Sequence, residues 1–266
     1  TVYLQNEATQ DSAAKLLTSQ VTTGSFSLSA VKLAVRSLWS GEMDEDSIIP
    51  VLSMYQNNLR VKTSEAIESM IINGDTAGTH MDNAVATLYA STAPEMGALG
   101  LRAWCVDQTN STAATGTMVV GDFADAKASM GKYAMDPDQT IWLMSPKAHN
   151  LILKLAEIET VDKYGLGATI LTGEIGRLYG TPVIVSGQFP ENLNASGLYD
   201  GSTTDNTGAI LCRRDAGVIG FKRQFKVETQ RIIATDQTEI VATTRPAFIV
   251  AYDTTPNPMW YLYNID

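Results

Sequence analysis

A helical spacing of apolar residues marks the segment before Asn73. Residues three, four or seven positions apart lie on one face of a helix. The residues with this spacing are Ile48, Leu52, Tyr55, Leu59, Ala66 and Met70. The pattern predicts a single helix over about 46–72, roughly 40 Å long at ~1.5 Å per residue, with Asp44 or Asp46 as its N-cap. Gly74 is predicted to end this helix in the left-handed conformation.

Alternating patterns predict a strand before this helix and several strands in the second half of the chain. Val31, Leu33 and Val35 alternate with polar or small residues in segment 31–39, as in a half-buried strand. Further strands, rich in β-branched and aromatic residues, are predicted over 140–145, 181–187, 208–214, 217–231 and 238–253. The strand over 181–187 is predicted to be buried. A turn at Asp236 and Gln237 is predicted between the last two strands.

Two shorter amphipathic helices are predicted between these strands. One covers 122–135, and the other covers 147–159 after Ser145 and Pro146, an N-cap and first-position pair. The polar segment 108–117 is predicted to be a loop. Helices and strands in this order, with long connections, predict the α+β class with mixed β-sheets.

Composition limits the classes of partner. The 266 residues are 44% hydrophobic and 18% charged, enough for a substantial core. The formal net charge of −10 and the pI of about 4.7 argue against tight non-specific binding of nucleic acid. No apolar run approaches the ~20 residues that cross a bilayer, so no membrane partner is expected. The two cysteines, Cys105 and Cys212, stand in apolar stretches and are predicted to be buried free thiols.

Sequence patterns for catalysis or metal binding are weak. The two histidines, His80 and His149, have no Ser, Cys or carboxylate partner at a recognisable spacing. In "GLGATILTGEIG", Ile170 takes the place of the third glycine of a dinucleotide-binding fingerprint. We therefore assign no catalytic, cofactor-binding or metal-binding residue. A small-molecule enzyme of α+β fold is an alternative that would require a pocket with convergent polar groups.

Two clusters of charge stand out. An acidic cluster precedes the long helix and consists of Glu42, Asp44, Glu45 and Asp46. A basic cluster, interleaved with phenylalanines, consists of Arg213, Arg214, Lys222, Arg223 and Lys226. Both clusters fit a solvated helix start and a solvated strand face. A second interpretation is that the acidic cluster of one subunit meets the basic cluster of another, which would fix register and specificity. A nucleic-acid strip is the third interpretation.

The order of several short motifs resembles the major capsid proteins of tailed bacteriophages. In that family a strand leads into an acidic entry motif and a long helix that closes on Asn-Gly. The matching residues here are Ser40, Glu42, Glu45, Asp46 and Ser47, followed by Asn73-Gly74-Asp75. The stretches "WLMSPKAHNLILKL", "YGTPVIVSGQFP" and "EIVATTRPAFIVAYD" resemble later landmarks of the family in the same order. The resemblance covers residues 20–253.

The resemblance implies the HK-ninety-seven-type capsid fold, with the long helix as its spine. The implied segments are an N-terminal arm remnant and extended loop (1–28), a peripheral domain with the spine helix (29–141), an axial domain (142–225) and return strands of the peripheral domain (226–266). The implied function is self-assembly of hexamers and pentamers into an icosahedral head around double-stranded DNA, without specific DNA binding and without a cofactor. The implied partners are a decoration protein, a portal and a scaffold or maturation protease. The protein would be assembled in the host cytoplasm and reside in the virion.

One feature departs from some members of the family. Those members cross-link a lysine of the extended loop to an asparagine near the C-terminal strand pair. Lys15 is the single lysine of the implied loop, and the partner region "KVETQRIIATDQ" contains no Asn. Cohesion through non-covalent contacts is therefore expected, with Lys15 as a candidate inter-subunit contact beside the two charge clusters.

Two questions stay open at the level of sequence. The first residue is Thr1, which fits either a longer chain or removal of an upstream segment by a maturation protease. An encapsulin-like nanocompartment shares the fold but encloses cargo enzyme in place of DNA, and it is the first alternative to a phage capsid.

Overall fold

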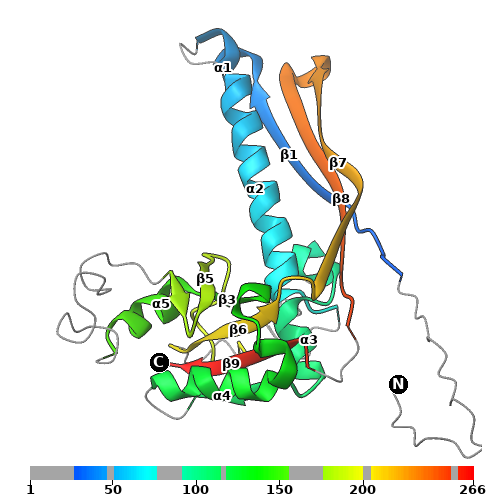
Figure 1. Cartoon of the computed structure of the whole chain (residues 1–266). Coiled ribbons are helices and arrows are strands. Elements are labelled where there is room, and N and C mark those ends of the chain that lie inside the picture. The colour runs from blue at the N-terminus through cyan, green and yellow to red at the C-terminus, as the bar shows by residue number, and fades with distance from the viewer. Residues whose placement is uncertain are drawn as a thin grey trace, which may run out of the picture.

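The described part of the chain forms two connected units. The computed structural model describes residues 27–46, 51–76, 92–114, 118–155, 176–199, 205–252 and 257–266. One unit, here called the spine module, consists of a long helix beside a three-stranded sheet. It projects from the other unit, the body, which is built around a six-stranded sheet (Figure 1). Helices occur together with parallel and antiparallel strand pairs, so the predicted α+β class with mixed sheets is confirmed.

The long predicted helix is present as α2, Val51–Asn73, with the short helix α1, Gly41–Asp46, before it. The 23 residues of α2 span roughly 35 Å at ~1.5 Å per residue. The predicted buried face holds only in part, because Leu52 is 40% exposed whereas Leu59 and Met70 are buried. The reason is that α2 lies beside the sheet of the spine module along most of its length and enters the body only in its last turns (Figure 1).

The N-cap predicted for the long helix at Asp44 or Asp46 is wrong, since both residues lie within the separate helix α1 and α2 begins at Val51. Helix α1 begins directly after a strand, and the Met43 N–H donates to the Ser40 hydroxyl oxygen at 3.3 Å. A serine at this position satisfies one of the backbone donors that a helix start leaves without an intrahelical partner. The acidic cluster therefore belongs to the helix and not to its cap.

The sheet of the spine module has the order β1-β8-β7 and is antiparallel throughout. Its strands are β1, Leu33–Ser40, β7, Gly217–Ile232, and β8, Gln237–Val250. All three strands were predicted, and the side chains of β1 alternate in exposure as expected. Trp39 of β1 stacks on Tyr55 of α2 with ring centroids 5.2 Å apart, which fixes the helix against the sheet.

The turn between β7 and β8 lies at the end of the spine module farthest from the body (Figure 1). Asp236 adopts a left-handed conformation there with φ 48°, as a turn residue. Gln237, the other predicted turn residue, is already the first residue of β8. Short 3₁₀ segments are η3, Pro94–Gly97, η4, Gly131–Ala134, η5, Pro137–Gln139, and η7, Ile233–Thr235.

The sheet of the body has the order β2-β9-β6-β3-β5-β4. Its strands are β2, Ser111–Ala113, β3, Thr140–Met144, β4, Arg177–Leu178, β5, Thr181–Val185, β6, Thr207–Arg213, and β9, Met259–Ile265. Its helices are α3, Leu101–Asp107, α4, Val120–Met130, and α5, Pro146–Leu153. Ser145 caps α5 as predicted, because its side-chain oxygen accepts the Ala148 N–H at 3.0 Å.

Three sequence expectations for the body need correction. The segment predicted as a loop over 108–117 contains β2, which pairs in parallel with β9, a strand that was not predicted. The strand predicted as buried is present as β5, but its Ile184 and Val185 are exposed because only the two-residue strand β4 lies beyond it. The predicted helix over 122–135 ends at Met130 and continues as a 3₁₀ segment.

Two apolar clusters form the interior of the body. Trp142 of β3 is fully buried and meets Phe123 of α4 edge-on, with ring centroids 5.2 Å apart. Cys105 and Cys212 lie in the second cluster as buried free thiols, as predicted. Burial raises the pKa of Cys212 to about 12, and it also raises the pKa of Cys105. Both thiols are therefore protonated at neutral pH and act as small apolar side chains.

Gly74 follows the last residue of α2, as predicted. The reason why a glycine is needed at this position differs from the predicted one. Its φ lies outside the left-handed region. A Cβ on Gly74 would instead overlap the carbonyl oxygens of Met70 and Ala98. The Gly100 N–H donates to the Gly74 carbonyl at 2.8 Å, so two glycine backbones meet where α2 enters the body.

Replacing Gly74 is expected to weaken this junction. Gly74→Ala should lower the free energy of unfolding by about 1–3 kcal/mol, because the new methyl group has only backbone atoms to displace. Gly187→Ala is the matched control, since a Cβ there meets nothing within 4 Å. Urea denaturation followed by circular dichroism measures both. Equal midpoints for the two variants would contradict the close approach.

A buried arginine completes the junction. Arg102 of α3 is fully buried. Its Nη1 donates to Asn73 Oδ1 at 2.8 Å, and its Nη2 donates to the Gly197 carbonyl at 3.1 Å. Its guanidinium also lies 5.7 Å from the ring centroids of Phe189 and Tyr261. Asn73, the last residue of the long helix, thus contacts a buried cation of the body.

The two sheets do not follow the segment boundaries that the resemblance implied. The body sheet contains strands from 111–113, from 140–213 and from 259–265, so it joins elements of three implied segments. The spine module joins β1 and α2 with β7 and β8. The implied arm and extended loop, apart from residues 27 and 28, lie outside the described residues.

Candidate assembly surfaces

The acidic cluster lies at the far end of the spine module. Helix α1 is held there by a hydrogen bond from the Gly41 N–H to the Asp236 carbonyl at 2.8 Å, and Figure 1 shows it at the tip farthest from the body. Glu42 is exposed at this tip. Asp44, Glu45 and Asp46 belong to the same short helix. Lys15 lies outside the described residues.

The basic cluster is divided between two places. Arg213 is the last residue of β6 and Arg214 follows it, so both belong to the body. Lys222, Arg223 and Lys226 lie on β7 of the spine module. The structure therefore does not bring the five predicted cations together as one patch, although they are close in sequence.

Arg213 is engaged within its own chain. Its Nε and Nη2 donate to the two carboxylate oxygens of Asp215, each at 2.8 Å. Its guanidinium lies 4.8 Å from the ring centroid of Tyr133 and 5.7 Å from that of Tyr252. The Tyr252 hydroxyl donates to Asp215 at 2.6 Å. Two hydrogen bonds lower the pKa of Asp215 to about 2, and the one from Arg213 has a larger effect than the one from Tyr252.

Acid is expected to weaken this cluster. A carboxyl whose pKa is lower in the folded state stabilises the fold above its unfolded pKa, near 3.9, and loses that contribution as pH falls toward the folded value. We expect Asp215→Asn to lower the free energy of unfolding at pH 6 by about 1 kcal/mol or less, because Asp215 is half exposed. The difference from the parent chain should shrink between pH 4 and pH 2. Urea titrations at several pH values measure it, and a difference that does not change with pH would contradict this assignment.

The cations of β7 differ in their partners. Lys226 forms an ion pair with Glu228 at 2.6 Å. Lys222 and Arg223 are exposed, as is Arg214 of the body. Within the described residues no ion pair involves Lys222, Arg223 or Arg214. These three side chains are therefore the members of the predicted basic cluster that are available to a partner.

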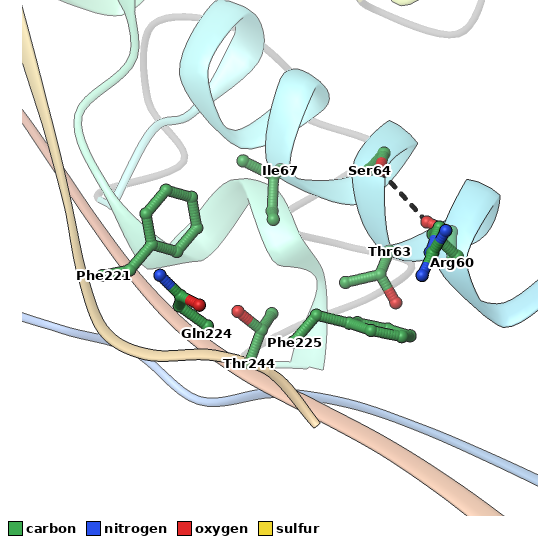
Figure 2. A pocket seen from close by; sticks show the side chains of 8 residues that line it. All are labelled: Arg60, Thr63, Ser64, Ile67, Phe221, Gln224, Phe225 and Thr244. Atoms are coloured by element: carbon green, nitrogen blue, oxygen red, sulfur yellow. Dashed lines mark hydrogen bonds between the residues drawn. The ribbon is translucent and has the colours of Figure 1, made fainter. Parts of the chain in front are cut away.

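A groove runs between α2 and β7. Figure 2 shows its central hollow, of about 430 Å³, which is lined by Arg60, Thr63, Ser64, Ile67, Phe221, Gln224, Phe225 and Thr244. A second hollow toward the body shares Ile67 and Phe221 with it, and a third toward the tip shares Arg60 and Phe225. One face of α2 from Ser53 to Ile72 forms a wall of this groove, roughly 28 Å long at ~1.5 Å per residue.

The groove offers contact area and lacks a catalytic arrangement. The hydroxyl of Thr63 donates to the Leu59 carbonyl at 2.7 Å, and that of Ser64 donates to the Arg60 carbonyl at 3.1 Å. Both hydroxyls are thus bonded to the helix backbone. Two phenylalanines line the groove on the β7 side, and Phe221 is 48% exposed. An exposed aromatic in a hollow is typical of a contact surface for another chain.

The described residues offer no further chemistry for a site. They contain no group of three or more His, Cys, Asp or Glu side chains that could hold a metal ion. His149 is half-buried on α5, and His80 lies outside the described residues. None of the described helices is both long and apolar enough to span a bilayer. No pattern in the sequence indicates the groove, because its aromatic wall depends on how β7 is paired with β8.

Comparison with known proteins identifies the fold. No family model matches the chain. The major capsid protein of Escherichia phage T5 is 23% identical over 205 residues, which cover 76% of this chain and 40% of that protein. The chain thus spans about two fifths of the length of this curated relative.

Solved structures resemble the chain over nearly its whole length. A Microbacterium phage Oxtober96 chain has a TM-score of 0.68 at 13% identity, covering 97% of this chain and 80% of that one. A capsid chain of an empty GTA particle has a TM-score of 0.64 at 16% identity, covering 98% of this chain and 81% of that one. The chain therefore has the fold of phage capsid proteins. The resemblance to tailed-phage major capsid proteins and the capsid fold that it implies are confirmed.

Proposed function

We propose that this chain is the shell-forming part of a major capsid protein, and that many copies assemble into the icosahedral head of a tailed double-stranded DNA bacteriophage. The observation that carries the proposal is the likeness to capsid chains over 97–98% of the sequence, which includes both the spine module and the body. A curated relative with the same role in its name supports it. The protein is structural and does not catalyse a reaction.

The two units correspond to two different domains in the proposed shell. We assign the spine module, α2 with β1, β7 and β8, to the peripheral domain. We assign the body, with its six-stranded sheet, to the axial domain around the centre of a hexamer or pentamer. Strands β2 and β9 would then go with the axial domain, although the implied segments placed residues 29–141 and 226–266 in the periphery. The arm remnant and extended loop would be residues 1–28.

The shell would hold together by burial of surface repeated over many copies. The surface that one chain buries against each neighbour would be small compared with the surface buried in the complete shell. Symmetry repeats each contact, and this repetition makes the assembly stable. A net charge of −10 fits a wall that encloses DNA by closure without binding it tightly. The proposed partners are further copies of the chain, a decoration protein, a portal, and a scaffold or maturation protease. Assembly would take place in the host cytoplasm, and the finished protein would reside in the virion.

Electron microscopy of the purified 266-residue chain tests the proposal. Closed shells in negative stain, with a matching mass by multi-angle light scattering, are the expected result. Intact-mass spectrometry should be done on the same sample, so that the particle is assigned to this chain. Nucleic acid measured after nuclease treatment distinguishes DNA inside a shell from an enzyme cargo. A monodisperse monomer or dimer at every protein and salt concentration would contradict the proposal.

A further inference from the structure

Two arginines stand directly opposite each other in the sheet of the spine module. Arg223 of β7 is paired with Arg245 of β8, between the pairs of Phe221 with Pro246 and Lys226 with Thr243. The pairing is irregular on both sides of Arg223, so β7 accommodates more residues than β8 over this stretch. The irregularity sets which side chains of β7 face α2.

The arginine pair faces away from the groove. Thr244 lines the groove on the side of α2, and successive residues of a strand point to opposite faces. Arg245 and its partner Arg223 therefore lie on the other face of the sheet. Arg223 is exposed. Arg245 is half-buried, its Nε has no hydrogen-bond partner, and its Nη2 donates to the Ala30 carbonyl at the long distance of 3.4 Å.

Two other cations of this face have acidic partners. Arg36 pairs with Glu239, and Lys226 pairs with Glu228 at 2.6 Å. The pKa of Glu228 is lowered first by Lys226, and the charge of Arg223 adds to this effect. Like charges directly opposite each other destabilise a strand pair. Arg223 and Arg245 thus form an excess of positive charge that an anionic partner would relieve.

The chain carries a complementary acidic segment that cannot reach this pair in the same copy. Helix α1 is held beside Asp236 at the tip, next to the first residue of β8. The distance along β8 from its first residue, Gln237, to Arg245 is about 27 Å at ~3.4 Å per residue. This separation exceeds the Debye length of about 8 Å at physiological salt. The acidic and basic surfaces can meet only between two copies.

We infer that α1 of one copy docks against Arg223 and Arg245 of the next copy, head to tail, with the exposed Glu42 as a contacting carboxylate. The inference rests on the proposed function, because it names one contact between neighbouring subunits. A contact between two different surfaces repeats from copy to copy and closes a ring when the rotation fits. Met43 is exposed beside Glu42 and adds apolar area to the same contact. The occupant is a second copy and not nucleic acid, because the chain carries a net charge of −10 and itself supplies a complementary acidic segment.

Reversal of one charge is expected to raise the stability of the monomer and to weaken its association. Arg223→Glu places a carboxylate opposite Arg245, so the melting temperature of the monomer should rise by roughly 1–3 °C. Its association, measured by sedimentation velocity at low and high salt, should weaken at least tenfold. Arg177 is exposed on the edge strand β4 of the body and forms an ion pair with the exposed Asp138, so Arg177→Glu carries the same change of charge and should associate like the parent chain. Because a stability gain accompanies the loss of association, misfolding cannot produce the expected result.

A charge swap then identifies the partner. Arg223→Glu with Arg245→Glu should abolish assembly, and adding Glu42→Arg and Glu45→Arg should restore particles in electron micrographs. Unchanged association of Arg223→Glu would overturn this contact and leave the proposed function standing. Normal shells that hold less nucleic acid would also overturn it, in favour of a surface that faces the genome. A parent chain that stays monomeric under all conditions would overturn the proposed function itself.

Discussion

Met70→Asp should prevent the chain from folding into a form that can assemble. Met70 is fully buried in the last turns of α2, and a Cβ on Gly97 would stand 3.1 Å from its sulfur. A carboxylate at this position would lose its water without gaining a cation. Burial of an unpaired charge costs roughly 3–5 kcal/mol or more, a large part of the 5–15 kcal/mol that keeps a typical domain folded. Shells should therefore be absent, and the urea midpoint should fall sharply or disappear.

Met54→Asp is the matched control for this change. Met54 lies on the same helix but is 53% exposed. The new carboxylate would stay in water, so the change in unfolding free energy should remain within about 0.5 kcal/mol. Circular dichroism and negative-stain microscopy of both variants give the comparison. If Met70→Asp kept the parental midpoint and formed shells in normal yield, the last turns of α2 would not be the structural support that we describe.

The sequence correctly predicted the elements that depend on residues close together in the chain. The strand before the long helix, the helix end at Asn73 and the cap at Ser145 all depend on residues within one or two turns. Burial along α2 could not be predicted in the same way. Leu52 and Met70 fit the same apolar stripe, yet only Met70 reaches the body. The difference is set by the surrounding fold, which a single helical pattern does not contain.

Elements that depend on distant partners were missed. Strand β2 is short and polar, and it exists because β9, well over a hundred residues later, offers a parallel edge. The candidate assembly surfaces show the same limit. The sequence grouped Arg213 with Arg223 by proximity, whereas the structure pairs Arg213 with Asp215 and places Arg223 opposite Arg245. The irregular pairing of β7 decides that arrangement, and no periodic pattern in the sequence reveals it.

Arg102→Met should destabilise the chain by roughly 3–5 kcal/mol, because it removes the cation on which the end of α2 closes. The amide oxygen of Asn73 and the carbonyl of Gly197 would lose their donors while staying buried. The contacts with two aromatic rings would be lost as well. Removal of a buried charge acts in the opposite direction. It is the smaller effect here, since the guanidinium already has two acceptors and two ring faces in place.

Arg102→Lys separates charge from geometry at this junction. A lysine keeps the charge but cannot donate in a planar fork to Asn73 and Gly197 while stacking on a ring. We expect its unfolding free energy to lie between those of the parent chain and Arg102→Met. Arg214→Met, which removes an exposed arginine of the body, should change stability by less than about 0.5 kcal/mol. Urea denaturation of the three variants gives the order. If Arg102→Lys matched the parent chain, charge alone would hold the spine module to the body, and the hydrogen bonds that we describe would contribute little.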